Sequence, residues 1–399
     1  MKIKHVNHSS LLLQSNEGNY LWCDPWIIST AFKTWVQNPK PSLQTVTDIL
    51  NIDNDNINIL VSHGHDDHLD EFVIKKHFNK TNVFIPKLRT PGVRNRITNL
   101  DCIPIEIGEE KYTCGGFEII NVINQDFTGD DTIFMISDDE HLVIHANDNY
   151  HHYNDTLLSQ IKDRMSKFKK EKTFYFVQRG IADSYPWSYE YYHDREVSEL
   201  VKERYKKYCE TIETNRKNLG VDKVLLYANQ AKITHDTKRE DWLLSVHKEV
   251  TGDYVYQTQL YPDNIIKDNN IINYYFDNGN KTYYQKCFEK YEELVNGYLK
   301  AVTPKDIYFP VKFFDRLFDN YKCNQPIHHV EVSANPEVWN DIFSGKQTIE
   351  AITIGGAGTI NKPLDYNLST MFHSMTKICY RIQSIINKEG LNWINYEHR

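Results

Sequence analysis

The segment SHGHDDHLD (62–70) places three histidines and three aspartates within nine residues. Neutral imidazole nitrogens are preferred ligands of zinc and iron, and carboxylates add oxygen donors. The segment follows the apolar run INILV, so we expect it on the loop at the carboxyl end of a strand, where α/β proteins usually build their sites. A solvated polar turn needs no histidines at this spacing. The segment therefore predicts metal-dependent chemistry.

The spacing within this segment predicts up to two metal positions. His63 and His65 are two residues apart, so their side chains point the same way in an extended segment. Asp67 and His68 follow once the chain turns, and they can reach a second position nearby. Two ions about 3.5–4 Å apart could hold a bridging hydroxide. Asp67 could also accept a proton, which makes it the candidate catalytic residue.

The pattern His63-x-His65-x-Asp67-His68 after an apolar strand resembles the signature of the metallo-β-lactamase superfamily. A narrower likeness covers roughly residues 10 to 240, where CDPWIISTAFKTW, IHANDN, RGIADSYPWSY and YANQAKITHD follow one another. Their order is similar to that in the metallo-β-lactamase-like part of the CMP-N-acetylneuraminate hydroxylase family. The resemblance implies an α/β fold, a four-layer αββα sandwich with two mixed sheets face to face, helices outside and metals at one edge. It also implies one or two divalent ions, zinc or iron, with manganese as a further choice.

The same resemblance implies two later ligands. An acidic residue after a later strand bridges both metals in the superfamily, and Asp148 in VIHANDN matches that place. A last histidine follows another strand, and His235 in LLYANQAKITH looks like it. The structural alternatives are a turn or helix-capping role for Asp148 and a surface position for His235.

One ligand of the superfamily pattern is missing. Most members carry a histidine between the first motif and the bridging aspartate, but NVINQDFTGDDT (121–132) has none. The substitutes left open are oxygen-bearing residues of that stretch, Asp126, Gln125 and Asp130. An oxygen-rich site favours iron or manganese over zinc, and the departure could also mean that only the second position is filled.

Other polar and aromatic residues are expected to support the site. Asp24 in CDPW is expected behind the metal loop, where it orients ligands, or else forms a plain Asp-Pro turn. His145 is expected to be packed and not to bind metal. Arg179, Tyr185 and Trp187 lie on a predicted loop facing the metals and could hold a phosphate or a sugar ring, although aromatic residues are abundant throughout the chain.

Short predicted strands alternate with helices, as an α/β fold requires. The strands are β-rich runs at 9–15, 19–25, 57–63, 81–86, 117–124, 132–138, 141–148, 173–178 and 223–229. Helices are predicted at 69–78, 154–170, 195–220 and 239–250. In 195–220 apolar residues recur every three or four positions, and Gly220 is a plausible stop.

The pattern changes beyond residue 251, so we expect a metal-binding core over 1–250 and a C-terminal α+β extension over 251–399 that covers the active-site edge. The extension is predicted to hold helices at 282–302, 305–322 and 367–390 and strands at 327–333 and 348–356. No Pro/Gly/Ser-rich linker separates the two parts.

Composition excludes several classes of protein. The formal charge of −8 over 399 residues argues against general nucleic-acid binding, which rewards clustered Lys and Arg. The seven cysteines are scattered with no CxxC or CxH, which argues against a zinc ribbon or a Rieske cluster and favours a reducing compartment. No apolar segment is long enough for a membrane span, and the N-terminus lacks a signal-peptide core, so a cytoplasmic location is expected.

Three functions fit these observations. The first is a metal-dependent hydrolase that uses a metal-activated water on a phosphodiester, ester or amide of a small molecule. The resemblance to the sialic-acid hydroxylase implies a second, a non-haem iron oxygenase acting on a nucleotide sugar or related metabolite. Because the chain has no CxH…CxxH pair, electrons would then come from a separate partner. The third is a non-catalytic nucleotide-binding module with a degenerate site.

Overall fold

The computed structural model describes most of the first 233 residues and short pieces beyond them. The described residues are 1–32, 35–37, 40–88, 92–124, 131–138, 140–168, 172–178, 189–190, 197–228, 231–233, 257–259, 263, 265–267, 270–272, 307–309, 331–334, 338, 342, 350–353 and 358–361.

One large sheet combines antiparallel and parallel strands in the order β18-β17-β1-β2-β3-β5-β6-β7. Its antiparallel part is formed by β18 (Asn270–Ile272), β17 (Ile265–Lys267), β1 (Lys2–Asn7), β2 (Ser10–Gln14) and β3 (Tyr20–Cys23). Its parallel part continues from β3 through β5 (Ile57–Leu60), β6 (Asn82–Pro86) and β7 (Ile103–Ile107).

The second large sheet is also mixed, with the order β16-β14-β12-β11-β10-β9-β8. Antiparallel pairing joins β8 (Tyr112–Cys114), β9 (Phe117–Asn124), β10 (Asp131–Ser137) and β11 (His141–Asn147). Parallel pairing then adds β12 (Lys172–Gln178), β14 (Val224–Tyr227) and β16 (Gln257–Gln259).

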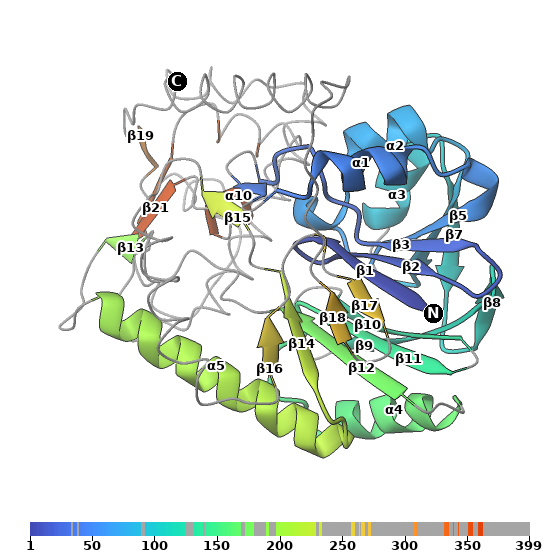
Figure 1. Ribbon diagram of the computed structural model, residues 1–399. Coiled ribbons are helices and arrows are strands. Elements are labelled where there is room, and N and C mark those ends of the chain that lie inside the picture. Colours follow the sequence, from blue (N-terminus) through green and yellow to red (C-terminus); the bar gives the residue numbers. More distant parts are fainter. Residues whose placement is uncertain are drawn as a thin grey trace, which may run out of the picture.

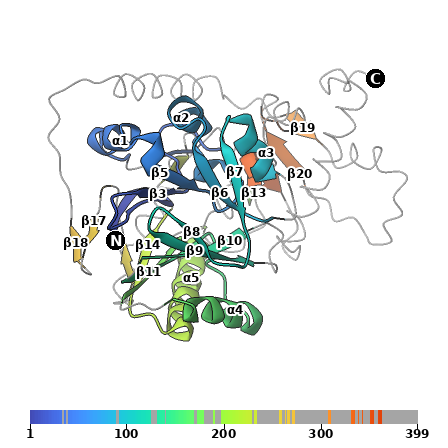
Figure 2. The ribbon, with the colours of Figure 1, turned by 90° about the vertical axis from the view of Figure 1, so that its right-hand side faces the viewer.

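Helices cover the outer face of each sheet, and the two sheets face each other (Figure 1). Helices α1 (Leu43–Leu50), α2 (Glu71–His77) and α3 (Gly92–Asn99) lie on the first sheet. Helices α4 (Asp155–Ser166) and α5 (Val197–Leu219) lie on the second, and the view turned by 90° shows the same layers (Figure 2). The predicted four-layer αββα sandwich is confirmed.

Three hydrophobic cores separate the four layers, because strands buried on both faces send alternate side chains to opposite sides. In β2, Leu11 and Leu13 enter the core between the sheets, whereas Leu12 enters the core under α1–α3. In β10, Phe134 points between the sheets and Met135 packs under α4 and α5. The uninterrupted apolar runs of the sequence are thus strands covered on both faces.

Local capping signals fix several helix ends. The Ser42 side chain accepts a hydrogen bond from Thr45 N at the start of α1, and the Asn154 side chain accepts one from Leu157 N at the start of α4. Such caps contribute about 1 kcal/mol each. Helix α5 ends as predicted before Gly220, whose φ of +69° is readily adopted by glycine.

Segments beyond residue 251 extend both large sheets, as β16, β17 and β18. A smaller four-stranded sheet has the order β13-β21-β20-β19 and combines β13 (Tyr189–Glu190) with β21 (Gly358–Asn361), β20 (Glu331–Ala334) and β19 (Ile307–Phe309). Strand β15 (Ala231–Ile233) pairs with β4 (Trp35–Gln37). The division at residue 250 and a role of the extension in covering the site stay predictions.

Two predicted elements of the C-terminal part are wrong. Residues Ile307–Phe309 form β19 and not part of a helix over 305–322, since the branched and aromatic run IYF pairs with β20. Residues Glu350–Thr353 form the short helix α10 where a strand over 348–356 was expected. An apolar run of this length does not distinguish a strand from a buried helical turn.

Among the helices that the structure describes, none is long and apolar enough to cross a membrane. In the described part of the chain, Cys23, Cys102 and Cys114 are free thiols.

Candidate metal centre

The histidine-rich loop leaves the carboxyl end of β5 and is fastened at its far end by Asp70. After a short 3-10 turn (Asp66–His68), the Asp70 side chain caps α2 by accepting a hydrogen bond from Val73 N. The same carboxylate accepts hydrogen bonds from the backbone N–H of Ile28 at 2.7 Å and of Ser29 at 2.9 Å. The loop is therefore fixed against the chain that follows β3.

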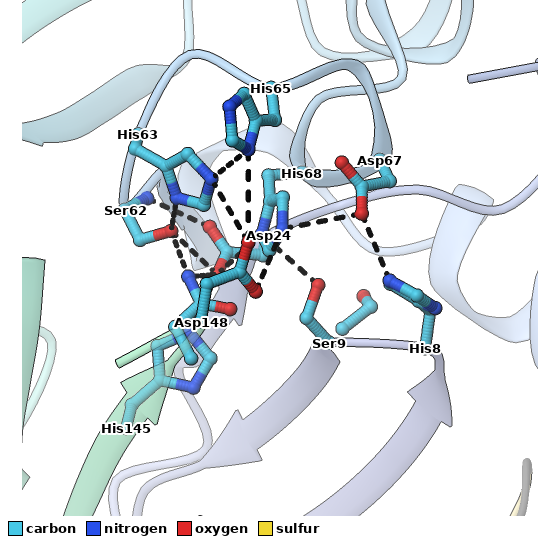
Figure 3. A network of polar contacts seen from close by, with 12 residues as sticks. His8, Ser9, Asp24, Ser62, His63, His65, Asp67, His68, His145 and Asp148 are labelled. Atoms are coloured by element: carbon cyan, nitrogen blue, oxygen red, sulfur yellow. Dashed lines mark hydrogen bonds and ion pairs between the residues drawn. The ribbon is translucent and has the colours of Figure 1, made fainter. Parts of the chain in front are cut away.

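A first group of donor atoms comes from His63, His65 and Asp148 (Figure 3). His63 Nε2 lies 2.7 Å from His65 Nδ1. Oδ2 of Asp148 lies 3.5 Å from His63 Nε2 and 3.7 Å from His65 Nδ1. The structure thus brings the carboxylate that follows β11 to the two histidines of the loop.

A second group lies beside the first and shares Asp148. His68 Nε2 is 3.6 Å from Asp148 Oδ1 and 3.5 Å from Asp67 Oδ2. His8, on the turn between β1 and β2, places its Nε2 3.0 Å from the same Asp67 oxygen. One oxygen of Asp148 faces each group, an arrangement that suits a carboxylate bridging two cations.

Hydrogen bonds on the far side of the rings determine which nitrogens are available for a cation. His68 Nδ1 lies 3.2 Å from Asp24 Oδ2, and since a carboxylate only accepts, this nitrogen carries the proton. His63 Nδ1 lies 2.9 Å from Ser62 Oγ, which itself donates to Asp24. The Nε2 atoms of His63 and His68 are therefore the ring nitrogens that face the cluster and are placed to bind a cation.

Buried polar atoms test whether these residues fit a metal. His68 Nε2 and Asp67 Oδ1 are buried and have no hydrogen-bond partner among the residues that the structure describes. Burying such groups without a partner is unfavourable by about 1–3 kcal/mol each. Two sets of three residues could each hold an ion, His8–Asp67–His68 and His63–His68–Asp148. Within each set, the ligand atoms all lie within 4.8 Å of one another. Nitrogen and oxygen donors in this arrangement fit a divalent cation such as zinc or iron.

Asp24 orients the cluster from behind, as expected. It is fully buried and accepts hydrogen bonds from Ser62 N at 2.8 Å, His145 Nε2 at 2.7 Å and Asn147 Nδ2 at 2.8 Å. His145 is packed, as predicted, and its Nδ1 lies 2.7 Å from the Tyr227 hydroxyl. Burial alone would raise the pKa of Asp24, but the neighbouring His68 and His145 outweigh it and hold the pKa well below its usual value.

The cluster attracts positive charge. Burial alone would raise the pKa of Asp67, yet the neighbouring His68 and His8 hold it well below its ordinary value. Burial would also lower the pKa of His65, but its hydrogen bond to Asp148 and the charges of Glu350 and Asp67 raise it to about 9. The carboxylates around His68 likewise raise its pKa well above the usual range.

Several non-glycine residues around the centre have a left-handed backbone conformation. His8, Asp24, Asn147 and Ala228 all have φ between +44° and +57°, and each follows or ends a strand. Phe32, with φ +49°, donates its N–H to Asp66 Oδ2 at 3.2 Å. Non-glycine residues rarely adopt this conformation.

Several residues singled out in the sequence fall outside the described part of the chain. These are the expected ligands His235 and Asp126, the alternatives Gln125 and Asp130, and the expected substrate contacts Arg179, Tyr185 and Trp187.

Two nearby side chains were missed from the sequence. His8 belongs to the cluster, and Asp131, at the start of β10, places Oδ1 3.9 Å from His63 Nε2. A histidine in the polar turn VNHSS directly before an apolar strand was the available signal for His8. Asp131 directly follows Asp130 in the stretch where a histidine is missing.

Residues 2–164 match the family model of the β-lactamase superfamily domain. A protein of Mycobacterium tuberculosis named as a Rieske 2Fe–2S iron–sulfur protein is 32% identical over 101 residues, which are 25% of this chain and 19% of that protein. The chain thus spans about a fifth of the curated relatives it matches. The likeness to the CMP-N-acetylneuraminate hydroxylase branch stays a prediction.

Two solved structures illustrate the structural comparisons. The isothiocyanate hydrolase from Delia radicum gut bacteria matches with a TM-score of 0.41 and 14% identity over 67% of this chain and 98% of that one. A possible metal-dependent hydrolase from Veillonella parvula matches with a TM-score of 0.42 and 12% identity, with the same two coverages of 67% and 98%.

Proposed function

From a chain that carries a β-lactamase superfamily domain over residues 2–164, we infer a metal-dependent hydrolase of small molecules. Its ligands would be His63, His65, Asp67, His68 and Asp148, around one or two divalent ions. The observation that supports this proposal most is the placement of Asp148, whose two oxygens face different histidines, at 3.5 Å from His63 Nε2 and 3.6 Å from His68 Nε2.

When bound, the ions would lower the pKa of a water molecule and polarise an ester, amide or phosphodiester. The chain's own residues set the geometry. Asp24 holds the protonated Nδ1 of His68, and Ser62 holds that of His63, so the other ring nitrogens stay available as ligands. This support fixes the positions of both donor groups before a substrate arrives.

Asp67 would accept the proton that leaves the attacking water. Its Oδ2 faces His8 and His68, whereas its buried Oδ1 has no hydrogen-bond partner among the described residues. The low pKa of Asp67 makes it a weak base, so it would serve only a strongly acidified water. Arg179, Tyr185 and Trp187 stay proposed substrate contacts, and His235 and Asp126 stay proposed ligands.

Asp148→Asn tests the metal centre directly. We expect its metal content to fall from up to two ions per chain to less than one, with hydrolysis lost on a panel of phosphodiesters, esters and amides. Asp163→Asn is a matched control, because Asp163 is exposed on α4 and its carboxylate contacts Arg164 and Lys167. Equal metal content in both variants, or no hydrolysis of the panel by the metal-loaded wild-type protein, would contradict the proposal.

An oxygenase is the second candidate, and the name of the mycobacterial relatives favours it. A Rieske cluster transfers single electrons. A relative that is named for such a cluster therefore suggests that the matching segment works together with an electron-transfer domain. The 399 residues contain no CxH…CxxH pair, so the electrons would come from a donor outside these residues. Metal analysis after anaerobic purification separates the candidates: zinc supports the hydrolase, and iron with oxygen uptake on addition of a reductant supports the oxygenase.

A further inference from the structure

We propose that His8 is a metal ligand, and that with Asp67, His68 and Asp148 it completes a four-donor site at the second position. The assignment rests on the proposed metal centre and adds to it a residue from the N-terminal hairpin. Three of the four ligands, His8, Asp67 and His68, bring their donor atoms within 4.8 Å of one another, and all three residues are at most 4% exposed. The fourth, Asp148, places Oδ1 3.6 Å from His68 Nε2.

The distances from His68 fit one cation. Bonds of 2.0–2.2 Å in a tetrahedral site place neighbouring donors about 3.3–3.6 Å apart. His68 Nε2 lies 3.5 Å from Asp67 Oδ2 and 3.6 Å from Asp148 Oδ1, and His8 Nε2 lies closer, 3.0 Å from Asp67 Oδ2. Two nitrogens and two oxygens are a complete set for a four-coordinate ion.

The surroundings of His68 suit a cation at this point. Its Nδ1 lies 3.2 Å from Asp24 Oδ2, and its buried Nε2 faces two carboxylates and has no hydrogen-bond partner among the described residues. A positive charge between Nε2 and these oxygens would satisfy all three groups. His8 Nε2 lies against the same Asp67 oxygen as His68 (Figure 3).

The hairpin holds His8 in place for this role. The His8 carbonyl accepts a hydrogen bond from Ala228 N at 2.7 Å and lies 2.8 Å from His5 Nε2. Its ring packs edge-on against Trp26 with centroids 5.0 Å apart. Its φ of +47° is a conformation that few non-glycine residues adopt, so the turn carries a histidine although glycine or asparagine would fit it more easily.

The alternative role for His8 is to position Asp67 through a hydrogen bond from a protonated Nε2. The two roles differ in one observable, the proton on that nitrogen. A ligand nitrogen carries none in the metal-loaded protein, whereas a hydrogen-bond donor keeps it.

The first test is ¹⁵N NMR of zinc-loaded, histidine-labelled protein. We expect the His8 Nε2 signal, assigned by its absence in His8→Gln, to show no directly bonded proton and to shift with those of His63 and His68. A directly bonded proton on His8 Nε2 in the zinc-loaded protein would overturn the proposal.

The second test is a Co²⁺ titration of wild type, His8→Gln and His77→Gln. Glutamine keeps an N–H donor for Asp67 but removes the imidazole, and His77, at the end of α2, is the control. We expect His8→Gln to bind its second Co²⁺ at least a hundredfold more weakly, with a changed visible spectrum, and to keep the first. If His8→Gln binds both Co²⁺ ions as tightly as the wild type, with an unchanged spectrum, His8 is not a ligand, and the rest of the proposed centre is unaffected. A wild-type protein that binds no Co²⁺ would refute the proposed centre as well.

Discussion

The two donor groups that share Asp148 differ in how closed they are. In the group of His63 and His65, the His65 side chain is 29% exposed. In the group of Asp67 and His68, the side chains are 5% and 0% exposed, and His8 closes the remaining side at 1%. In the proposed metal centre, solvent and substrate would therefore reach the ions beside His65, whereas the ion beside His68 would lie in a nearly dry, four-donor site.

The largest expected effect is that of Asp24→Ala, because Asp24 supports both groups. It holds His68 directly and His63 through Ser62. Removing the carboxylate leaves several buried donors without an acceptor, so we expect the free energy of unfolding to fall by about 3–5 kcal/mol and metal binding to be lost. Chemical denaturation measures the first effect. Asp53→Ala, at an exposed turn, should change stability by at most about 1 kcal/mol.

The pH dependence of metal binding tests whether His65, in the more exposed group, is a metal ligand. In the metal-free protein its pKa is raised to about 9, so the ring is protonated at neutral pH and must lose that proton to bind an ion. The apparent affinity of the first position should therefore rise with pH, by up to about tenfold per unit between pH 6 and 8, and level off above 9. Titration at several pH values, with proton release measured in weak buffer, checks this. An affinity that is flat or falls with pH would show that His65 is not a ligand.

Chelation tests whether the closed group retains its ion longer. With EDTA in excess, we expect the ion beside His65 to leave first and the ion beside His68 to leave about ten times more slowly, because exposed ligands exchange with water more easily. Metal content sampled over time should show two phases. In His8→Gln the slow phase should disappear. A single phase in the wild-type protein would mean that the two positions do not differ.

The smallest expected effect is that of Arg96→Ala, which acts on the loop from outside. The Arg96 guanidinium donates to the Gly64 carbonyl and to Glu71 Oε1 at 2.6 Å, and it lies 3.2 Å from Asp66 Oδ1. Since the side chain is 26% exposed, we expect a loss of about 1 kcal/mol in stability and a few-fold weaker first metal position. Arg94→Ala, whose exposed side chain pairs with Glu106, is the control and should leave metal binding unchanged.

The sequence predicts the structure best where the residues of a single segment are enough to indicate its conformation or its role. The β-rich runs around Leu12 and Phe134 are strands because they are apolar on both faces, and the loop 62–70 carries its donors at fixed spacing. Helix α1 was not predicted, because Thr45, Val46 and Thr47 are β-branched residues that favour strands over helices. The helix is stabilised instead by the Ser42 cap and by burial of one face.

The position of His8 could not be predicted in the same way. It meets Asp67 across 59 residues of sequence, and this contact depends on the order β1-β2-β3-β5 in the sheet. Strand β1 itself was missed, because Lys2, Lys4 and His5 obscure the alternation of a strand whose edge is covered by β17. Asp131 depends likewise on pairing, between β9 and β10. Contacts between distant strand ends have no local signature in a single sequence.

The left-handed residues at the strand ends have a consequence for evolution and engineering. Replacing His8, Asp24 or Asn147 by glycine would relieve backbone strain of roughly 1–2 kcal/mol per residue. The same change would remove a buried side chain that braces the cluster, and at Asp24 that loss exceeds the relief. Selection for thermal tolerance would therefore find its gains elsewhere in the chain, and heat-adapted descendants should keep the strained backbone at the centre.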